Sequence, residues 1–231
     1  MALAVTAVGA LVQGTVGVGF GVLSVPILSL VDPVLAPVPQ LLLAVPLALS
    51  MSWRERSHID ARGVTWLLAG RVPGALIGLW VLGLTAQRSI DIAIAVSVIT
   101  AVVILGTGVT VRRTPPAEFG TGVIAGVMGM VAAVGGPPAA LLFKDGEGPT
   151  VRASLALFFS GGLFVTVAFR AFAGRITGDD VLVTGLLLPG LLAGYLASSR
   201  LRARVDAGPI RPAILGISLV AAAGLLLRAL I

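Results

Sequence analysis

The sequence GTVGVGFG at residues 14–21, followed by Pro26, interrupts an apolar run that extends over residues 2–30. Relative to alanine, glycine destabilises a helix interior by about 1 kcal/mol and proline by about 3 kcal/mol. An apolar run of this length is otherwise typical of a membrane-spanning helix, so the interruption would release backbone amides and carbonyls inside the bilayer. Those groups need protein, water or a substrate as partners. We therefore expect a broken helix here, interrupted by the glycines and by Pro26.

A second apolar run, residues 119–143, contains Gly126 and Gly129 and then GGPP at residues 135–138. Interrupted segments at corresponding places in two halves of a chain indicate the binding site of a transporter, where half-helix N-termini bind anions. The alternative is that each glycine only permits close helix packing, as small residues commonly do in membranes. Because both clusters are followed by proline, we favour a functional break in each run.

An internal repeat relates the two breaks. A shift of 116 residues superimposes PGALIG at residues 73–78 on PGLLAG at residues 189–194. Duplications of this kind mark many transporter folds. We predict two transmembrane halves, residues 1–113 and 114–231. A shift of 112 residues likewise places Gly14 on Gly126, Gly17 on Gly129 and Pro26 on Pro138.

The composition identifies the solvent of this chain as a lipid bilayer. Of 231 residues, 57% are hydrophobic and only 11% are charged, which leaves too little polar surface for a soluble domain. The cationic residues that give the net charge of +6 lie mainly between the apolar runs, so they indicate membrane topology and not nucleic-acid binding. The absence of cysteine excludes disulfides, thiolate metal sites and a cysteine nucleophile.

Eight apolar runs predict an all-α, polytopic membrane protein made of two four-segment repeats. Most runs approach the roughly 20 residues that a helix needs to cross about 30 Å of hydrocarbon. Helices are required because backbone polar groups in lipid need internal partners. We expect a multi-pass protein of the cell membrane, inner or plasma. The runs are residues 2–30, 35–53, 64–84, 90–111, 119–143, 151–172, 181–198 and 212–231.

Two topologies compete, and the distribution of Lys and Arg over the loops discriminates between them, because cytoplasmic loops carry the excess. If all eight runs cross the bilayer, the cations divide eight to seven. If the first run of each half is re-entrant, they divide eleven to four, which favours this arrangement and makes the halves inverted repeats. The eleven are Arg54, Arg56, Arg62, Arg112, Arg113, Lys144, Arg152, Arg200, Arg202, Arg204 and Arg211, and the four are Arg88, Arg170, Arg175 and Arg228.

Arg71 is the one charge well inside an apolar run, and no Asp or Glu lies deep in another run to neutralise it. An intramembrane cation indicates a functional site, because insertion alone costs about 2.5–3.5 kcal/mol. The alternative is that Arg71 snorkels to the interface. Arg170 and Arg228, near run ends, are expected to be interfacial anchors. The predicted substrate-binding residues are Arg71, Gly17, Gly19, Gly21, Ser24, Pro26, Gly135, Gly136, Pro137 and Gln40.

The sequence contains no carboxylate pair, no metal-ligand cluster, no nucleophile with a base and no phosphate-binding loop, so an enzyme is disfavoured. No catalytic residue, metal or cofactor is predicted. The expected partners are a small anionic substrate and the lipid bilayer, without nucleic acid. A second copy of the chain, forming a homodimer, is a further candidate.

Three motifs together resemble the sulfite exporter TauE/SafE family of membrane transporters over essentially the whole chain. They are a Gly-rich broken first segment in each half (GVGFG at residues 17–21, GGPP at residues 135–138), a G-x-I loop (Gly174-Arg175-Ile176) and the P-G-x-x-x-G helices. Phe20 and the Pro137-Pro138 pair depart from the family pattern. The resemblance implies transport of a small anion such as sulfite, a sulfonate or a carboxylate. A channel-like or structural component without alternating access is the alternative.

Overall fold

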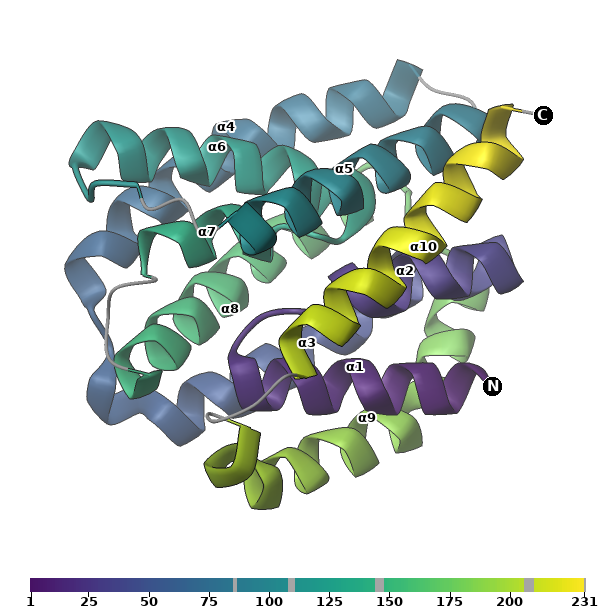
Figure 1. Ribbon diagram of the computed structural model, residues 1–231. Coiled ribbons are helices and arrows are strands. Elements are labelled where there is room, and N and C mark those ends of the chain that lie inside the picture. The colour runs from purple at the N-terminus through teal and green to yellow at the C-terminus, as the bar shows by residue number, and fades with distance from the viewer. Residues whose placement is uncertain (85–86, 108–110, 144–147, 206–209, 231) are drawn as a thin grey trace.

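The computed structural model describes residues 1–84, 87–107, 111–143, 148–205 and 210–230 (Figure 1). Helix makes up 89% of the structure, and the described residues contain no strand, which confirms the all-α prediction. The elements are α1 (Ala2–Val16), α2 (Phe20–Val31), η1 (Pro33–Leu35), α3 (Val38–Glu55), η2 (Arg56–His58), α4 (Ala61–Leu84), α5 (Gln87–Thr107), α6 (Pro115–Ala132), α7 (Gly136–Leu142), α8 (Gly148–Phe172), α9 (Gly178–Val205) and α10 (Ile210–Leu230).

Both interrupted runs are divided into two helices. The first break is confined to residues 17–19, where Gly17 and Gly19 adopt φ values of 93° and 131° that favour glycine. The second break follows α6, where Ala133 takes a left-handed conformation with φ of 54°. The expectation that Pro26 also interrupts the first run is wrong, because α2 continues through it.

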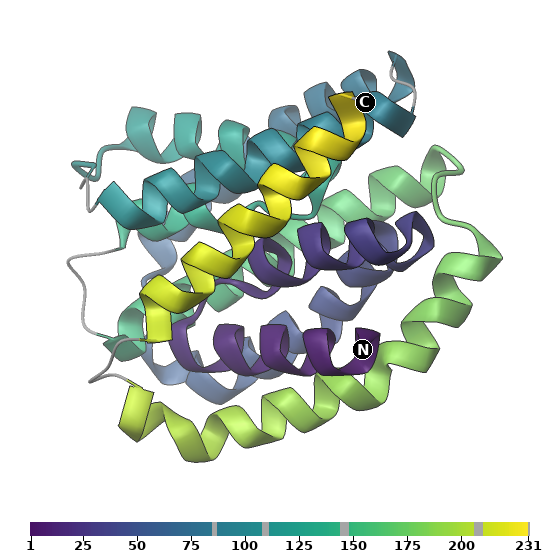
Figure 2. The same ribbon diagram turned by 45° about the vertical axis from the view of Figure 1, so that its right-hand side comes forward.

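The repeated P-G-x-x-x-G motif lies in α4 and in α9, where it brings pairs of helices into close contact. A Cβ atom added at Gly74 would lie 2.1 Å from the carbonyl oxygen of Val123 in α6. One added at Gly194 would lie 1.9 Å from the carbonyl oxygen of Ala7 in α1. Small residues at such places let helix backbones approach. α4 therefore packs on α6 and α9 on α1, while α3 packs on α8 and α5 on α10 (Figures 1 and 2).

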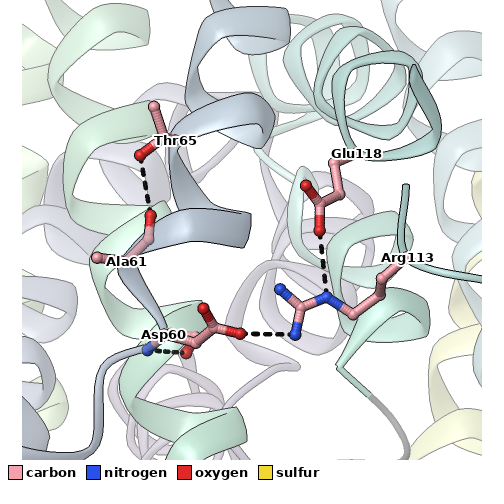
Figure 3. A network of polar contacts seen from close by, with 6 residues as sticks. Asp60, Ala61, Thr65, Arg113 and Glu118 are labelled. Atoms are coloured by element: carbon pink, nitrogen blue, oxygen red, sulfur yellow. Dashed lines mark hydrogen bonds and ion pairs between the residues drawn. The ribbon is translucent and has the colours of Figure 1, made fainter. Parts of the chain in front are cut away.

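An ion-pair network marks one end of the bundle (Figure 3). Arg113, between α5 and α6, donates from Nη1 to Asp60 Oδ2 at 2.7 Å and from Nε to Glu118 Oε1 at 3.2 Å. Its guanidinium also lies 4.6 Å from the ring centroid of Phe143, which follows α7. The hydrogen bond from Arg113 lowers the pKa of the Asp60 carboxyl below its usual value. The start of α4, the start of α6 and the end of α7 therefore meet here.

The opposite end is marked by Arg228 in the last turn of α10. Its Nη2 donates to Asp91 Oδ2 in α5 at 2.9 Å, and its Nη1 donates to the carbonyl oxygen of Ser29 near the end of α2 at 2.8 Å. The N-terminus lies on the same side, and α1 and α2 run in opposite directions (Figures 1 and 2). Each broken segment thus folds back toward the end at which it started: α1–α2 toward the Arg228 end and α6–α7 toward the Arg113 end.

Five helices of the described chain are long and apolar enough to cross a membrane: Pro33–Arg54, Ala61–Leu84, Ser89–Gly106, Pro149–Phe172 and Gly178–Leu201. Shorter apolar helices are Ala2–Val16, Phe20–Val31 and Leu215–Leu230. The chain is therefore a multi-pass membrane protein. Two of the eight apolar runs are helix pairs, which confirms that the first segment of each half is broken, while the number of segments that cross the membrane stays a prediction. The boundary at residues 113/114, the inverted repeat and the cell membrane as location stay predictions, and Lys144 lies outside the described residues.

Candidate anion-binding site

A small cavity of about 40 Å³ lies between the two breaks. Gly19, Phe20 and Gly21 line it from the first break, and residues 135–137 line it from the second. Arg71 reaches it from α4. The two breaks also touch directly, since a Cβ atom on Gly21 would lie 2.3 Å from the carbonyl oxygen of Ala133. A cavity of this size accommodates roughly three water molecules, so any ligand here would be small.

Arg71 is 2% exposed, and its guanidinium has one unpartnered group. Nη1 donates to the carbonyl oxygen of Ala125 at 3.2 Å, and Nη2 donates to Thr166 Oγ1 at 3.4 Å. The ring centroid of Phe158 lies 5.1 Å from Cζ. The buried Nε has no hydrogen-bond partner, and no ion pair joins Arg71 to a carboxylate among the described residues. The positive charge is thus buried and uncompensated, and the snorkelling alternative is excluded by its burial.

Three glycines enclose the guanidinium. Cβ atoms added at Gly129, Gly135 and Gly162 would lie 2.6 Å from Nη2, 2.5 Å from Nη1 and 2.2 Å from Nε, respectively. These distances are far below any ordinary carbon–nitrogen contact, so a larger residue at any of the three positions would displace Arg71. Glycine here provides room for the cation, in addition to any effect on the backbone.

The two breaks contribute different numbers of hydrogen-bond donors. At the first break, Phe20 N donates to Gln13 Oε1 at 3.0 Å, and the amides of Gly21 and Val22 lie in the first turn of α2, where no intrahelical acceptor exists. At the second break, α7 begins with Gly136 and two prolines, which have no amide hydrogen. Amide donors come mainly from the first break, whereas the cation comes from α4.

The structure brings six of the ten predicted binding residues to the cavity and places four elsewhere. Those lining the cavity are Arg71, Gly19, Gly21, Gly135, Gly136 and Pro137. Of the other four, Gly17 contacts the Arg152 side chain, Ser24 donates to the carbonyl oxygen of Phe20 at 2.6 Å, Pro26 is buried in α2, and Gln40 donates to the carbonyl oxygen of Leu35 at 3.4 Å.

Sequence reasoning did not select the residues that hold Arg71 from other helices. Gly129, Gly162, Phe158 and Thr166 contact its guanidinium. The spacing of four between Gly162 and Thr166 puts both on one face of α8, but nothing in the sequence pairs that face with α4.

Of the two arginines expected to be interfacial anchors, Arg170 is buried inside the bundle, whereas for Arg228 the expectation stays a prediction. Arg170 is 4% exposed and donates from Nη2 to the carbonyl oxygen of Met130, so the prediction of an interfacial anchor is wrong for it. The position of Arg170 near the end of an apolar run suggested that its side chain is accessible to solvent, but α6 packs against it. Arg228 forms the ion pair with Asp91.

A multi-pass helical bundle with two broken helices beside a buried arginine is an arrangement typical of membrane transporters. The chain matches the family described as Sulfite exporter TauE/SafE over residues 1–225, and it belongs to that family. Members of the family are membrane transporters and not enzymes. Comparisons with curated proteins and with solved structures found no match.

Proposed function

We propose that this protein carries a small sulfur-containing anion, such as sulfite or a sulfonate, across the membrane through the cavity between the two breaks. The observation that supports this most directly is Arg71, a buried cation with an unpartnered Nε and with no ion pair to a carboxylate in the described part of the chain. A guanidinium in this state is costly without an anion. An oxoanion would supply the missing acceptor and the opposite charge.

The donors around the cavity favour an anion over a cation or a neutral solute. The amides of Gly21 and Val22 lie at the positive end of the α2 dipole, which favours negative charge. No carboxylate is found among the described residues that line the cavity. One full charge and a few amides match the charge of a small oxoanion, and the remaining lining, including Phe159 and Leu163, is apolar.

The helix directions support two re-entrant hairpins related by an inverted repeat. Both ends of the α1–α2 hairpin lie at the Arg228 end of the bundle, and both ends of the α6–α7 hairpin lie at the Arg113 end. With the Arg113 end in the cytoplasm, the excess of Lys and Arg lies on that side, as the positive-inside rule requires. An inside-negative potential then favours anion efflux by about 2.3 kcal/mol per charge per 100 mV, so export would need no coupling ion.

The experiment measures binding of sulfite and of methanesulfonate to the purified protein, followed by uptake of radiolabelled sulfite in proteoliposomes. Arg71→Gln should weaken binding of both anions at least tenfold, because a charge-assisted hydrogen bond contributes about 1.5–3 kcal/mol. Arg71→Lys should give an intermediate affinity, because it keeps the charge but loses the planar fork.

The matched control is Arg200→Gln, an exposed arginine in the last turns of α9, which should bind as the wild type does. Saturable uptake separates a carrier from a channel-like component, for which flux would rise linearly with concentration. Equal affinity in the wild type and in both Arg71 variants would contradict the proposed site.

A further inference from the structure

Arg170 is a second buried arginine with an unpartnered group. Its Nη2 donates to the carbonyl oxygen of Met130, and its buried Nε has no hydrogen-bond partner. The side chain borders a hollow of about 210 Å³ at the Arg228 end of the bundle. We name this hollow the Arg170 vestibule; it is lined by Arg170, Arg175, Asp180, Pro33, Val38 and Leu82, among others.

Asp180 is the carboxylate among the described residues that line the vestibule, and it interacts electrostatically with Arg170, but the hydrogen bonds of its side chain are made to Thr177. Asp180 Oδ2 accepts hydrogen bonds from Thr177 N at 2.8 Å and from Thr177 Oγ1 at 2.7 Å, and Asp180 N donates to Thr177 Oγ1 at 3.2 Å. These reciprocal bonds form a capping box at the start of α9. No ion pair connects Arg170 with a carboxylate within the described part of the chain. The described lining of the vestibule therefore has a net positive charge, and one of its two cations, Arg170, has an unpartnered Nε.

One face of α8 carries residues that contact Arg71 and also carries Arg170, which lines the vestibule. Gly162, Thr166 and Arg170 are four residues apart, so they lie on the same face at steps of about 6 Å. Gly162 faces the Nε of Arg71, and Thr166 Oγ1 accepts from its Nη2. On α6, Gly129 contacts Arg71, and the next residue, Met130, binds Arg170. The two guanidinium groups are therefore neighbours along a single helix face.

We propose that the Arg170 vestibule is a second oxoanion-binding site, through which the substrate passes between the Arg71 cavity and the solution at the Arg228 end. The proposal rests on the proposed function. Arginine suits this role because its planar donor fork matches an oxoanion. A second cationic side chain on the same face of α8 would give the anion a further binding group on its way out of the deep cavity.

The first test measures charge in the vestibule independently of transport. Because the chain has no cysteine, Val38→Cys places a single thiol in the lining. A sulfonate-bearing thiosulfonate reagent should modify this thiol faster than a trimethylammonium-bearing one, relative to their rates with a free thiol. Adding Arg170→Gln should lower the rate ratio about fivefold, because one positive charge is lost, whereas Arg170→Lys should retain it. An unchanged ratio in Arg170→Gln would overturn the proposal.

A second measurement leaves Arg170 intact, in case its replacement impairs folding. Methanesulfonate should slow modification of Val38→Cys by the anionic reagent, and no protection at high concentration would overturn the proposal. Transport then separates the two proposals: Arg170→Gln should lose the binding of methanesulfonate that belongs to the vestibule, keep the binding that Arg71→Gln abolishes, and transport sulfite at least tenfold more slowly than wild type. If binding depends on Arg71 but Arg170→Gln transports sulfite as fast as wild type, the vestibule proposal is rejected and the proposed function stands. Loss of any Arg71 dependence would reject the proposed function.

Discussion

Arg71 occupies a space that three glycines leave free. Its position depends on contacts from α6 and α8, and a methyl group at any of these glycines would compete with the guanidinium for the same volume. Burial of the charge is tolerated because two of its donor groups have partners and an aromatic ring covers one face. The remaining donor, Nε, is the one to which the proposed function assigns the anion.

Adjacent glycines in α8 provide a matched test of this arrangement. A Cβ atom at Gly162 would lie 2.2 Å from Arg71 Nε, whereas one at Gly161 would lie 2.9 Å from the flexible end of Leu68. We expect Gly162→Ala to lower the affinity for methanesulfonate at least tenfold, because Arg71 must move. Gly161→Ala should stay within about twofold. Equal affinities in the two variants, measured by titration of the purified proteins, would mean that the position of Arg71 does not control binding.

Among the helices, the pairs α1–α9 and α4–α6 have the closest backbone approach. In α4, the first glycine of the P-G-x-x-x-G motif, Gly74, faces a carbonyl oxygen of α6. In α9, the second glycine of the motif, Gly194, faces a carbonyl oxygen of α1. Without a hydrophobic driving force in lipid, such close packing is a main source of association between helices. These pairs also carry the breaks, since α1 and α6 end at them. Stable packing of α9 and α4 therefore holds the cavity in place.

This packing predicts opposite effects for two glycines of α9. Gly194→Ala should lower the free energy of unfolding by about 1–3 kcal/mol, because its Cβ would overlap the carbonyl oxygen of Ala7. Gly185 has no neighbour within 4 Å of an added Cβ, so Gly185→Ala should be neutral or stabilise by up to about 1 kcal/mol. Thermal unfolding in detergent checks both. A Gly194→Ala protein that melts at the wild-type temperature would contradict the packing.

At the scale of the whole molecule, the arrangement of the broken segments determines how many times the chain crosses the bilayer. Both ends of α6–α7 lie at the Arg113 end, and α1–α2 starts and ends at the other. If these segments are re-entrant, the chain has three full crossings in each half, with α3, α4 and α5 matched by α8, α9 and α10. The cavity would then lie where two hairpins from opposite sides meet.

Single introduced cysteines test this topology with an impermeant thiol reagent, which reaches only the outer face of sealed cells and both faces of permeabilised cells. Re-entrant segments predict that Arg112→Cys and Thr150→Cys, which flank α6–α7, are labelled from the same, cytoplasmic side. Val34→Cys, after α2, should be labelled from the other side. A full crossing of α6–α7 would instead put Arg112→Cys and Thr150→Cys on opposite sides, and that result would reject the inverted arrangement.

The sequence by itself determined the helical membrane fold, the two breaks and the family, because these follow from local composition: hydrophobic length, glycine and proline clusters, and short motifs. It also identified Arg71, since a charge inside an apolar run is visible without a structure. The prediction that Pro26 interrupts the helix was wrong, because α2 continues through it and proline is tolerated within membrane helices.

The tertiary structure alone decided which distant residues surround Arg71 and which do not. Gly162 and Thr166 lie about 90 positions away in the sequence, and only the packing of α8 against α4 brings them to its guanidinium. The burial of Arg170 likewise depends on its packing against α6. The sequence of α8 alone does not predict this contact. The physical reason is that a local pattern specifies which elements form and which face is apolar, whereas contacts between elements depend on the shapes of both surfaces at once.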